Sequence, residues 1–450
     1  MSEKLDNDAV VDRALASIGG ASVDAGEVFL RDGQSTSIEV REGELENVIS
    51  RGERGIGVRL LRGGRVGFAY TSDLSAGGIE ECVDAARDIA AVTEPDPDIR
   101  IASEPLETAD LRLFEPGLDE RPIVERGNVA LEVERAARAV DKRVNAFRKT
   151  TYSDGAVTTI LATTGGVRGS YRETYFSVGT SAVATQGEER QIGYHGEAKR
   201  RFGALSADAV GRRAAELAVG KLGAKPFKTQ ELPVVLDPYM GMSLLGAVVP
   251  LFSADAVLKG KSLFAGKLDR TIASERVTIV DDARIPGALR SAPFDGEGVA
   301  TTTRTLVRGG LLTGYLSSLK TARKMEVAPT GNARRSSYAQ PSRIGAANFH
   351  LAAGTTDPQT LVRELPRALR VTSLLNLHTI DPISGEFSLG ATADYLEHGE
   401  RVHPVQGITI AGNLTSLLSS ITGVANDLIF GSSGIGSPTF VISELSIGGA

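Results

Sequence analysis

The chain has 450 residues, of which 41% are hydrophobic and 24% are charged, and its formal net charge is -6 at pH 7. This composition excludes wholesale disorder, and the acidic balance argues against a nucleic-acid-binding surface. The single cysteine, Cys82, excludes an intrachain disulfide and a cysteine-based zinc finger, so we expect a reducing compartment.

The sequence shows no targeting or membrane segment. The first 20 residues lack a basic region followed by an apolar run, which is the pattern of a signal peptide. No apolar run approaches the 18 residues that a membrane-spanning helix requires. We therefore expect a protein of the cytoplasm that makes no membrane contact.

The first half of the chain alternates helical and β-like patterns. Apolar residues at helical spacing predict an opening helix over residues 7–18. The runs FLR and SIEV are β-like, with a glycine-containing turn expected between them, and Gly63-Gly64 predicts a hairpin between two further β-like runs. Ser75 is expected to cap a helix whose apolar stripe includes Cys82.

The rest of the first half continues in the same way. After a proline-rich acidic connector, a second long helix is predicted from Ile123 to Val140. β-like stretches follow over residues 144–201, and a third helical pattern covers Ser206–Leu222. Residues 220–233 are interpreted as a linker, which divides the chain into domains 1–225 and 226–450.

The second half consists mainly of short β-like runs. Near its start, an apolar pattern over residues 239–252 predicts a helix, and Pro250 is expected to end or kink it. A Gly309-Gly310 turn joins two strands, and helices are expected near residues 358–369 and 414–421. The residue patterns alone predict a sheet-rich protein of two domains, divided near residue 225.

Three short motifs of catalytic or phosphate-binding type are incomplete. Gly260-Lys261-Ser262 has the tail of a phosphate-binding loop, but Asp255 stands where its first glycine should be. The run GSSGIGSP at 431–438 matches a dinucleotide fingerprint or a nucleophile elbow only in part. We interpret both as turns, and Cys82 as a core residue instead of a nucleophile.

The histidines show no metal-binding spacing. His398 and His403 flank an expected hairpin turn and would need a third ligand from elsewhere, so we interpret them as surface residues. His195 and His350 lie within β-like runs and are interpreted as structural.

Two groups of carboxylates attract attention, Asp281-Asp282 and the pair Asp295 and Glu297. Spacing alone does not separate a catalytic pair from a solvated turn, and we interpret both groups as turns. From the residues alone, no complete catalytic constellation emerges.

Several long phrases occur in a fixed order along the chain. They are GIGVRLLRGGRVGFAYTSDL (55–74), LFSADAVLKGKSLFAGKL (251–268), FDGEGVATTTRTLVRGGLLTGYL (294–316), PTGNARR (329–335), SGEFSLGATADYLEHGERVHPVQGITIAGNL (384–414) and GSPTFVISELSIGG (436–449). Together they resemble the TldD/PmbA family, and more closely its PmbA branch, also called TldE. The resemblance covers nearly the whole chain. It implies an α+β fold: an N-terminal α/β domain with helices on a sheet, and a β-rich, mainly antiparallel C-terminal domain.

In this family the TldD-type chains carry an H-E-x-x-x-H metal motif and a cysteine ligand near the C-terminus. Counted back without gaps from Gly260, the two histidine positions fall on Leu245 and Pro250, and the glutamate position falls on Gly246. These residues offer neither a zinc ligand nor a general base, and the only cysteine is Cys82. The resemblance therefore implies no catalytic residue and no metal in this chain.

The resemblance also implies a partner. PmbA-type chains pair with TldD-type chains, which supply the zinc, and the complex degrades unfolded or flexible peptides. Three alternatives stay open: a stand-alone homodimer that binds peptides without catalysis, an independent hydrolase that uses His398 and His403, and a direct gyrase-binding protein. The family's label as a modulator of DNA gyrase is indirect, and the acidic charge argues against DNA as a ligand.

Within PTGNARR, Asn332, Arg334 and Arg335 are the candidates for peptide contact. They could hold a peptide backbone or a carboxylate, and an arginine can do so by a bidentate contact. The alternative is a loop in which these side chains serve only to hold the structure together.

Overall fold

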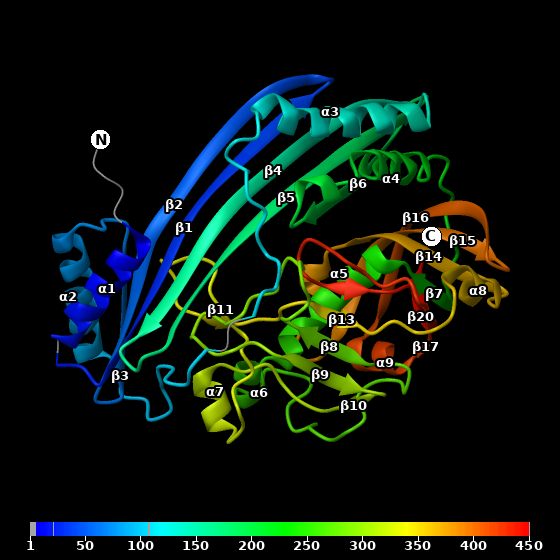
Figure 1. The fold of residues 1–450 in the computed structure, drawn as a ribbon. Coiled ribbons are helices and arrows are strands. Elements are labelled where there is room, and N and C mark those ends of the chain that lie inside the picture. The colour runs from blue at the N-terminus through cyan, green and yellow to red at the C-terminus, as the bar shows by residue number, and fades with distance from the viewer. Residues whose placement is uncertain (1–5, 21, 107–108, 450) are drawn as a thin grey trace.

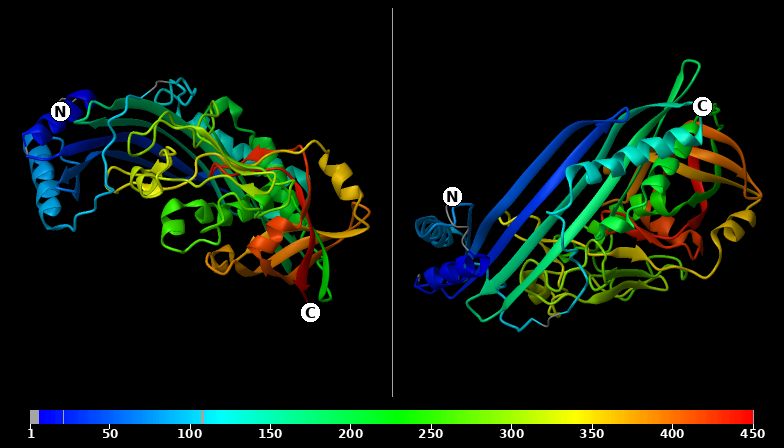
Figure 2. Two further views of the ribbon diagram at one scale, coloured as in Figure 1. Left: turned by 90° about the horizontal axis from the view of Figure 1, so that it is seen from below. Right: turned by 45° about the horizontal axis from the view of Figure 1, so that its top comes forward.

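The computed structural model describes residues 6–20, 22–106 and 109–449, and it has an α+β architecture (Figure 1). Over those ranges the strands form three six-stranded sheets and one two-stranded pair. One large sheet belongs to the first half of the chain. Figures 1 and 2 show its long strands arching over the second half, which contains the other sheets.

The first sheet has the strand order β3-β2-β1-β4-β5-β6, and every neighbouring pair is antiparallel. Its strands are β1 (Ala25–Arg41), β2 (Glu44–Arg62), β3 (Arg65–Thr71), β4 (Val144–Thr163), β5 (Arg168–Gln186) and β6 (Glu189–Lys199). Four helices accompany it: α1 (Asn7–Gly19), α2 (Ala76–Val92), α3 (Ile123–Val140) and α4 (Ala207–Val219). The predicted N-terminal domain with helices on a sheet is confirmed.

All four helices cover the same face of this sheet. Because successive side chains of a strand point to opposite faces, Val28 and Ile38 of β1 lie on one face. Val28 packs with residues of α1 and α2, and Ile38 packs with residues of α3 and α4. Phe29 lies on the other face, where it packs against Phe294 of the second half. The second face is therefore turned toward the C-terminal region.

Local signals in the first half predicted the structure well, with one error. Ser75 accepts a hydrogen bond from the backbone of Gly78 at the start of α2, and Gly63 and Gly64 form the turn between β2 and β3 with positive φ. The turn expected at Gly33 is absent, because β1 continues through this residue. Gly33 pairs with Glu53 of β2 on one side and with β4 on the other. Neighbouring strands on both sides override the turn tendency of a glycine.

The second half contains two six-stranded sheets, with orders β16-β15-β14-β7-β20-β17 and β10-β9-β8-β13-β19-β18, and the pair β11-β12. The strands are β7 (Gln230–Leu236), β8 (Ile279–Asp282), β9 (Thr303–Arg308), β10 (Leu311–Leu312), β11 (Ala333–Arg334), β12 (Arg343–Ile344), β13 (Phe349–Leu351), β14 (Arg367–Leu375), β15 (Glu386–Glu397), β16 (Glu400–Asn413), β17 (Ile421–Val424), β18 (Ile429–Phe430), β19 (Gly436–Ser437) and β20 (Phe440–Gly448). Only β7–β14 and β13–β19 pair in parallel, so the expected antiparallel character is confirmed.

Short helices connect these strands. They are α5 (Pro238–Val248), α6 (Ala254–Leu258), α7 (Leu319–Lys324), α8 (Pro358–Arg363) and α9 (Leu414–Ser419), and short 3₁₀ turns lie at Phe202–Ala204, Val249–Phe252 and Leu377–Thr379. Pro250 falls in the 3₁₀ turn after α5, as expected. The helix expected near 358–369 is shorter, because α8 ends at Arg363 and Pro366 precedes the strand β14.

The chain passes from the first sheet to the second half between α4 and β7, so residue 225 lies in this connection. The largest hydrophobic core cluster lies entirely beyond that point and includes Leu245 of α5 and Phe252 after it. Across the described ranges, no helix combines the length and the apolar character needed to cross a bilayer.

Candidate functional site

A polar groove runs along the second face of the first sheet. Its volume is about 730 Å³, and alternate residues of β5 form its floor: Glu173, Tyr175, Ser177, Gly179 and Ser181. Ser153 of β4 and Tyr194 of β6 continue this floor on either side. Loops of the C-terminal half form the opposite wall with Leu289, Arg290 and Ser432. The groove is thus formed by both halves of the chain.

A smaller cavity adjoins one end of the groove. Its volume is about 220 Å³, and it shares Arg31, Glu173, Leu289 and Arg290 with the groove. Its remaining walls include Arg334 and Arg335 of the PTGNARR segment, together with Asp295 and the rings of Phe29, Tyr171 and Phe294. The structure therefore brings two of the three predicted peptide-contacting residues to the end of the groove.

The three candidates occupy different surroundings. Asn332 is buried and donates to Asp281 at 2.7 Å and to the carbonyl of Gly345 at 3.2 Å. Arg335 is buried as well, and it donates to Glu27 at 2.7 Å. Arg334 is only half-buried, and its guanidinium makes no hydrogen bond or ion pair with any described residue. Asn332 and Arg335 thus hold the segment in place, although Nε and one terminal nitrogen of Arg335 also lack a partner. Arg334 differs because its guanidinium makes no such bond at all with the described residues.

The interpretation of the carboxylates as solvated turns is wrong for Asp281, Asp295 and Glu297, because all three are buried. Asp295 accepts backbone hydrogen bonds from Glu297, Val299 and Ala333 at 2.9 to 3.0 Å. Burial and the neighbouring Glu297 raise the pKa of Asp295 to about 7. These acids hold the backbone beside Arg334 in place.

A buried ion cluster joins the two halves next to this cavity. Glu27 of β1 accepts hydrogen bonds from Arg59 of β2 at 2.6 Å and from Arg335 at 2.7 Å. Arg59 also lies 3.4 Å from Glu297. Burial acts to raise the pKa of Glu27, but the charges of Arg59 and Arg335 hold it below its ordinary value. The cluster fixes the PTGNARR segment against the sheet.

Arg290 lies on the wall shared by the groove and the smaller cavity. Its Nε donates to the carbonyl of Ser433 at 3.2 Å, and its side chain forms no ion pair with a described residue. Burial and the nearby charge of Arg334 lower the pKa of Arg290, whereas the charge of Glu173 raises it. In the described structure neither Arg290 nor Arg334 forms an ion pair, although Glu173 lines the same cavity.

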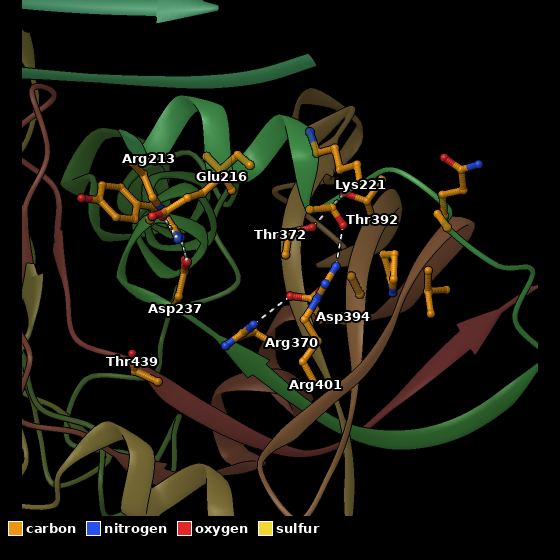
Figure 3. A pocket seen from close by; sticks show the side chains of 18 of the residues that line it. Arg213, Glu216, Lys221, Asp237, Arg370, Thr372, Thr392, Asp394, Arg401 and Thr439 are labelled. Carbon is orange, nitrogen blue, oxygen red and sulfur yellow. Dashed lines mark hydrogen bonds and ion pairs between the residues drawn. The ribbon is translucent and has the colours of Figure 1, made fainter. Parts of the chain in front are cut away.

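A second cavity of about 460 Å³ lies between α4 and the C-terminal sheet (Figure 3). Arg213 of α4 donates at 2.9 Å to Asp237, the residue that caps α5. On the opposite wall, Arg370 and Arg401 donate to Asp394 at 2.8 and 2.6 Å. Since these three cations already have carboxylate partners, we interpret this cavity as a junction between the two halves.

Comparison with known proteins decides the family. Sequence profiles of the PmbA/TldA metallopeptidase domain 1, central domain and C-terminal domain match residues 26–90, 115–222 and 229–449 in order. The chain belongs to the PmbA/TldD family. The first two matched regions contribute strands to the same sheet, β1 to β3 and β4 to β6.

The relatives of this PmbA/TldD chain match it over nearly their whole length. It is 29% identical to the metalloprotease PmbA of Escherichia coli O157:H7, over 93% of this chain and 91% of that one. It is 27% identical to a metalloprotease TldD homolog of Haemophilus influenzae, over 95% and 93%.

Solved structures of relatives have the same fold. A proposed modulator of a DNA gyrase from Thermotoga maritima matches with a TM-score of 0.90 at 27% identity, over 98% of this chain and all of that one. TldE from Thermococcus kodakarensis matches with a TM-score of 0.90 at 20% identity, over 98% and 100%. At that identity the second likeness concerns the fold alone.

The positions that the sequence analysis assigned to the family's metal motif carry no metal ligands. Leu245 is buried in the apolar core, Gly246 has no side chain, and Pro250 is exposed in the 3₁₀ turn after α5. None of these residues carries a side-chain donor for zinc. In the described part of the chain, no three His, Cys, Asp or Glu side chains are grouped so that they could hold a metal ion.

The other sequence candidates have structural roles or lie apart from the groove. Ser262 of the partial phosphate-binding loop donates to the carbonyl of Leu251 at 2.6 Å. His398 is exposed at the turn between β15 and β16, and His403 packs against Tyr395. Within GSSGIGSP, Gly434 adopts a positive φ in a turn, and Ser432 of the same run reaches the groove wall.

Three further candidates, two histidines and the cysteine, also have structural roles. His195 packs edge-on against Tyr239 at 4.8 Å, and His350 packs edge-on against Phe430 at 5.1 Å. Cys82 lies in the core between α2 and the sheet, as predicted.

Sequence reasoning missed Arg290, Glu27 and Arg59. Glu27 and Arg59 lie in β strands, and nothing in their neighbourhood in the sequence indicates burial. Arg290 lies in an irregular segment without a motif. Only the pairing of β1 with β2 and the packing of the two halves bring these residues to the cavity.

Proposed function

We propose that this chain is a PmbA/TldE-type subunit of a metallopeptidase complex that degrades unfolded or flexible peptides. In this proposal the chain binds peptide, and a TldD-type partner supplies the zinc and the catalytic residues. The observation that carries the proposal is which residues occupy the three motif positions. Leu245, Gly246 and Pro250 provide neither a metal ligand nor a general base.

The polar groove supports a role in peptide binding. Its floor offers the hydroxyl groups of Ser153, Ser177 and Ser181. Ser153 and Ser177 already donate to Ser37 and to the carbonyl of Ser153, both at 3.2 Å, so their oxygens serve as acceptors. Such groups bind a main chain without regard to its side chains, which suits unfolded or flexible peptides of varied sequence. Glu173 to Ser181 are nine residues of β5, and their eight intervals span about 26 Å at the rise of a strand. An extended peptide of roughly eight residues matches this length.

A partner subunit accounts for the absence of metal ligands. This chain is similar over nearly its whole length both to proteins named PmbA and to proteins named TldD. Two chains of the same fold can pair through equivalent surfaces, one with a metal site and one without. We expect the complex to work in the cytoplasm, because one buried cysteine suits a reducing compartment.

The test is peptide cleavage by the full chain alone, by a TldD-type chain from the same cells, and by an equimolar mixture. Unstructured peptides are the substrates, and products are identified by mass spectrometry. We expect cleavage in the mixture at a rate well above that of either chain alone. Zinc content, measured by elemental mass spectrometry, should follow the TldD-type chain.

Each other outcome has a definite meaning. Cleavage by this chain alone would contradict the proposal and point to an unrecognised catalytic site. Peptide binding without cleavage in any mixture, together with a homodimer in light scattering, would favour the stand-alone peptide-binding protein. A His403→Ala variant distinguishes a metal site at His398 and His403, because only such a site would lose bound metal.

A further inference from the structure

We propose that the cavity lined by Arg290 and Arg334 binds the C-terminal carboxylate of a peptide that lies extended in the polar groove. This inference rests on the proposed function, since it identifies the part of the peptide that the chain recognises. It assigns direct contact to Arg290 and Arg334. It assigns to Asn332 and Arg335 the role of positioning Arg334.

The first observation is the unused hydrogen-bonding capacity of Arg334. Its Nε and one terminal nitrogen are inaccessible to solvent, yet neither donates to a group in the described ranges. A buried donor without a partner costs about 1 to 3 kcal/mol, and more when the group is charged. A guanidinium presents its donors as a planar fork that matches the two oxygens of a carboxylate. An incoming carboxylate would satisfy these donors.

The second observation is the charge of the cavity. Of the other cations in its walls, Arg31 lies 3.4 Å from Glu53 and Arg335 is paired with Glu27. Arg290 and Arg334 remain without an ion pair among the described residues, and they are close enough for the charge of Arg334 to disfavour that of Arg290. An anion placed between two such cations relieves their repulsion.

The carboxylates in and around this cavity already have hydrogen-bond or ion-pair partners. Asp295 accepts three backbone hydrogen bonds, and Glu173 is paired with Arg200 at 2.8 Å. Asp281 accepts hydrogen bonds from Asn332 and from the backbone of Ala347, both at 2.7 Å. None of these acids hydrogen-bonds to Arg290 or Arg334 in the described structure. The cavity therefore keeps its preference for an external anion.

The backbone around Arg334 is held firmly enough to present such a site. Arg334 lies in β11, which pairs with β12, so its position is fixed relative to Arg343. On one side of it, the backbone N–H of Ala333 donates to Asp295 at 2.9 Å. On the other side, Arg335 is tied to Glu27. Preorganised donors reduce the entropy that a ligand loses on binding.

The location distinguishes one end of a peptide from its middle. The cavity of about 220 Å³ adjoins the groove of about 730 Å³ through Arg31, Glu173, Leu289 and Arg290. A main chain that lies along β5 would bring its terminal group to this junction. A peptide with a free C-terminal carboxylate then gains charge-assisted hydrogen bonds that its C-terminal amide does not.

The experiment measures the binding of three fluorescein-labelled, unstructured octapeptides of Gly, Ser and Ala by fluorescence anisotropy. The first has a free C-terminal carboxylate, the second a C-terminal amide, and the third a C-terminal amide with one internal Glu. Each peptide is titrated with the full chain alone. A second titration uses the full chain mixed with a metal-depleted TldD-type chain. We expect the free acid to bind roughly tenfold tighter than both amides.

Single substitutions test whether Arg290 and Arg334 cause the preference for the free acid. Arg334→Gln and Arg290→Gln should each remove the preference for the free acid, so that the free acid and the amide bind equally. The matched control is Arg343→Gln, which removes the same charge from the exposed neighbour of Arg334 on β12 and should keep the preference. Unchanged thermal unfolding confirms that the variants fold, and Arg334 makes no internal bond whose loss would matter.

Equal binding of acid and amide by the unaltered chain would overturn the inference but leave the proposed function intact. So would a preference that survives both substitutions. If the amide with an internal Glu binds as tightly as the free acid, the site recognises acidic side chains and not the C-terminus. If no peptide binds to the chain or the mixture, the proposed function fails together with the inference.

Discussion

Glu27 and Arg335 are joined by a hydrogen bond of 2.7 Å although 308 positions separate them in the chain. Both side chains are fully buried, at 0% exposure. The second oxygen of Glu27 accepts from Arg59 at 2.6 Å, so one carboxylate serves two guanidinium groups. This contact ties the first sheet to the segment that carries Arg334.

The first prediction concerns this cluster. Glu27→Ala leaves two buried cations without their shared carboxylate, which costs about 3 to 5 kcal/mol when such a pair is broken. We expect a loss of that size in the free energy of unfolding, measured by urea denaturation. Asp84→Ala, which breaks the exposed 2.6 Å pair with Arg87 on α2, should change stability by less than about 0.5 kcal/mol. Equal effects of the two substitutions would show that the buried cluster contributes little.

The second prediction concerns the close packing of α2 against strand β3. A Cβ added at Gly67 of β3 would lie 1.7 Å from the carbonyl oxygen of Ala86 on α2. Gly67→Ala must therefore push helix and strand apart, and we expect a loss of about 3 kcal/mol or more. Gly52→Ala is the control, because nothing lies within 4 Å of its added Cβ. Thermal unfolding measures both, and a stable Gly67→Ala variant would contradict the close contact.

The third prediction concerns pH. Burial, with the charge of Arg213 as the second cause, lowers the pKa of His195 to about 4 from an ordinary value of 6.5. Between these values the unfolded chain binds a proton that the folded chain does not, so stability falls as pH decreases from 6.5 toward 4. We expect His195→Gln to weaken this dependence, measured by urea denaturation at several pH values. The exposed His378→Gln should leave it unchanged, and equal slopes for all three proteins would refute the assignment.

The fourth prediction concerns the only thiol. Burial between α2 and the sheet raises the pKa of Cys82 to about 11. At pH 8 only about a thousandth of such a thiol is ionised, and the thiolate is the reactive form. We expect a chromogenic disulfide reagent to modify Cys82 slowly in the folded protein and rapidly in guanidinium. Modification of the folded protein within seconds would mean that α2 opens readily.

Sequence reasoning succeeded where the signal was local. The helix at Ile123–Val140 follows from the spacing of its apolar residues, and its bounds agree with the structure. The hairpins at Gly63-Gly64 and Gly309-Gly310 follow from residues that tolerate positive φ. The assignment of the family's metal-motif positions to Leu245, Gly246 and Pro250 rests on the family phrases alone and stays a prediction.

It failed where the deciding partner is distant in the chain. Gly33 was expected in a turn, but neighbouring strands on both sides extend β1 through it. Glu297 was expected in a solvated turn, yet its partner Arg59 lies 238 positions away. Arg290 carries no local sign of its role, because its lack of a counter-ion depends on what the rest of the fold brings near it.

The separation of Glu27 from Arg335 also has a consequence for synthesis of the protein. At about 5 to 20 residues per second, Arg335 leaves the ribosome roughly 15 to 60 s after Glu27. During that interval the second face of the nascent sheet has no cover from the C-terminal half. The serine, threonine and tyrosine side chains along β4 and β5 keep this face compatible with water. We therefore expect the polarity of this face to limit aggregation of the partly synthesised chain.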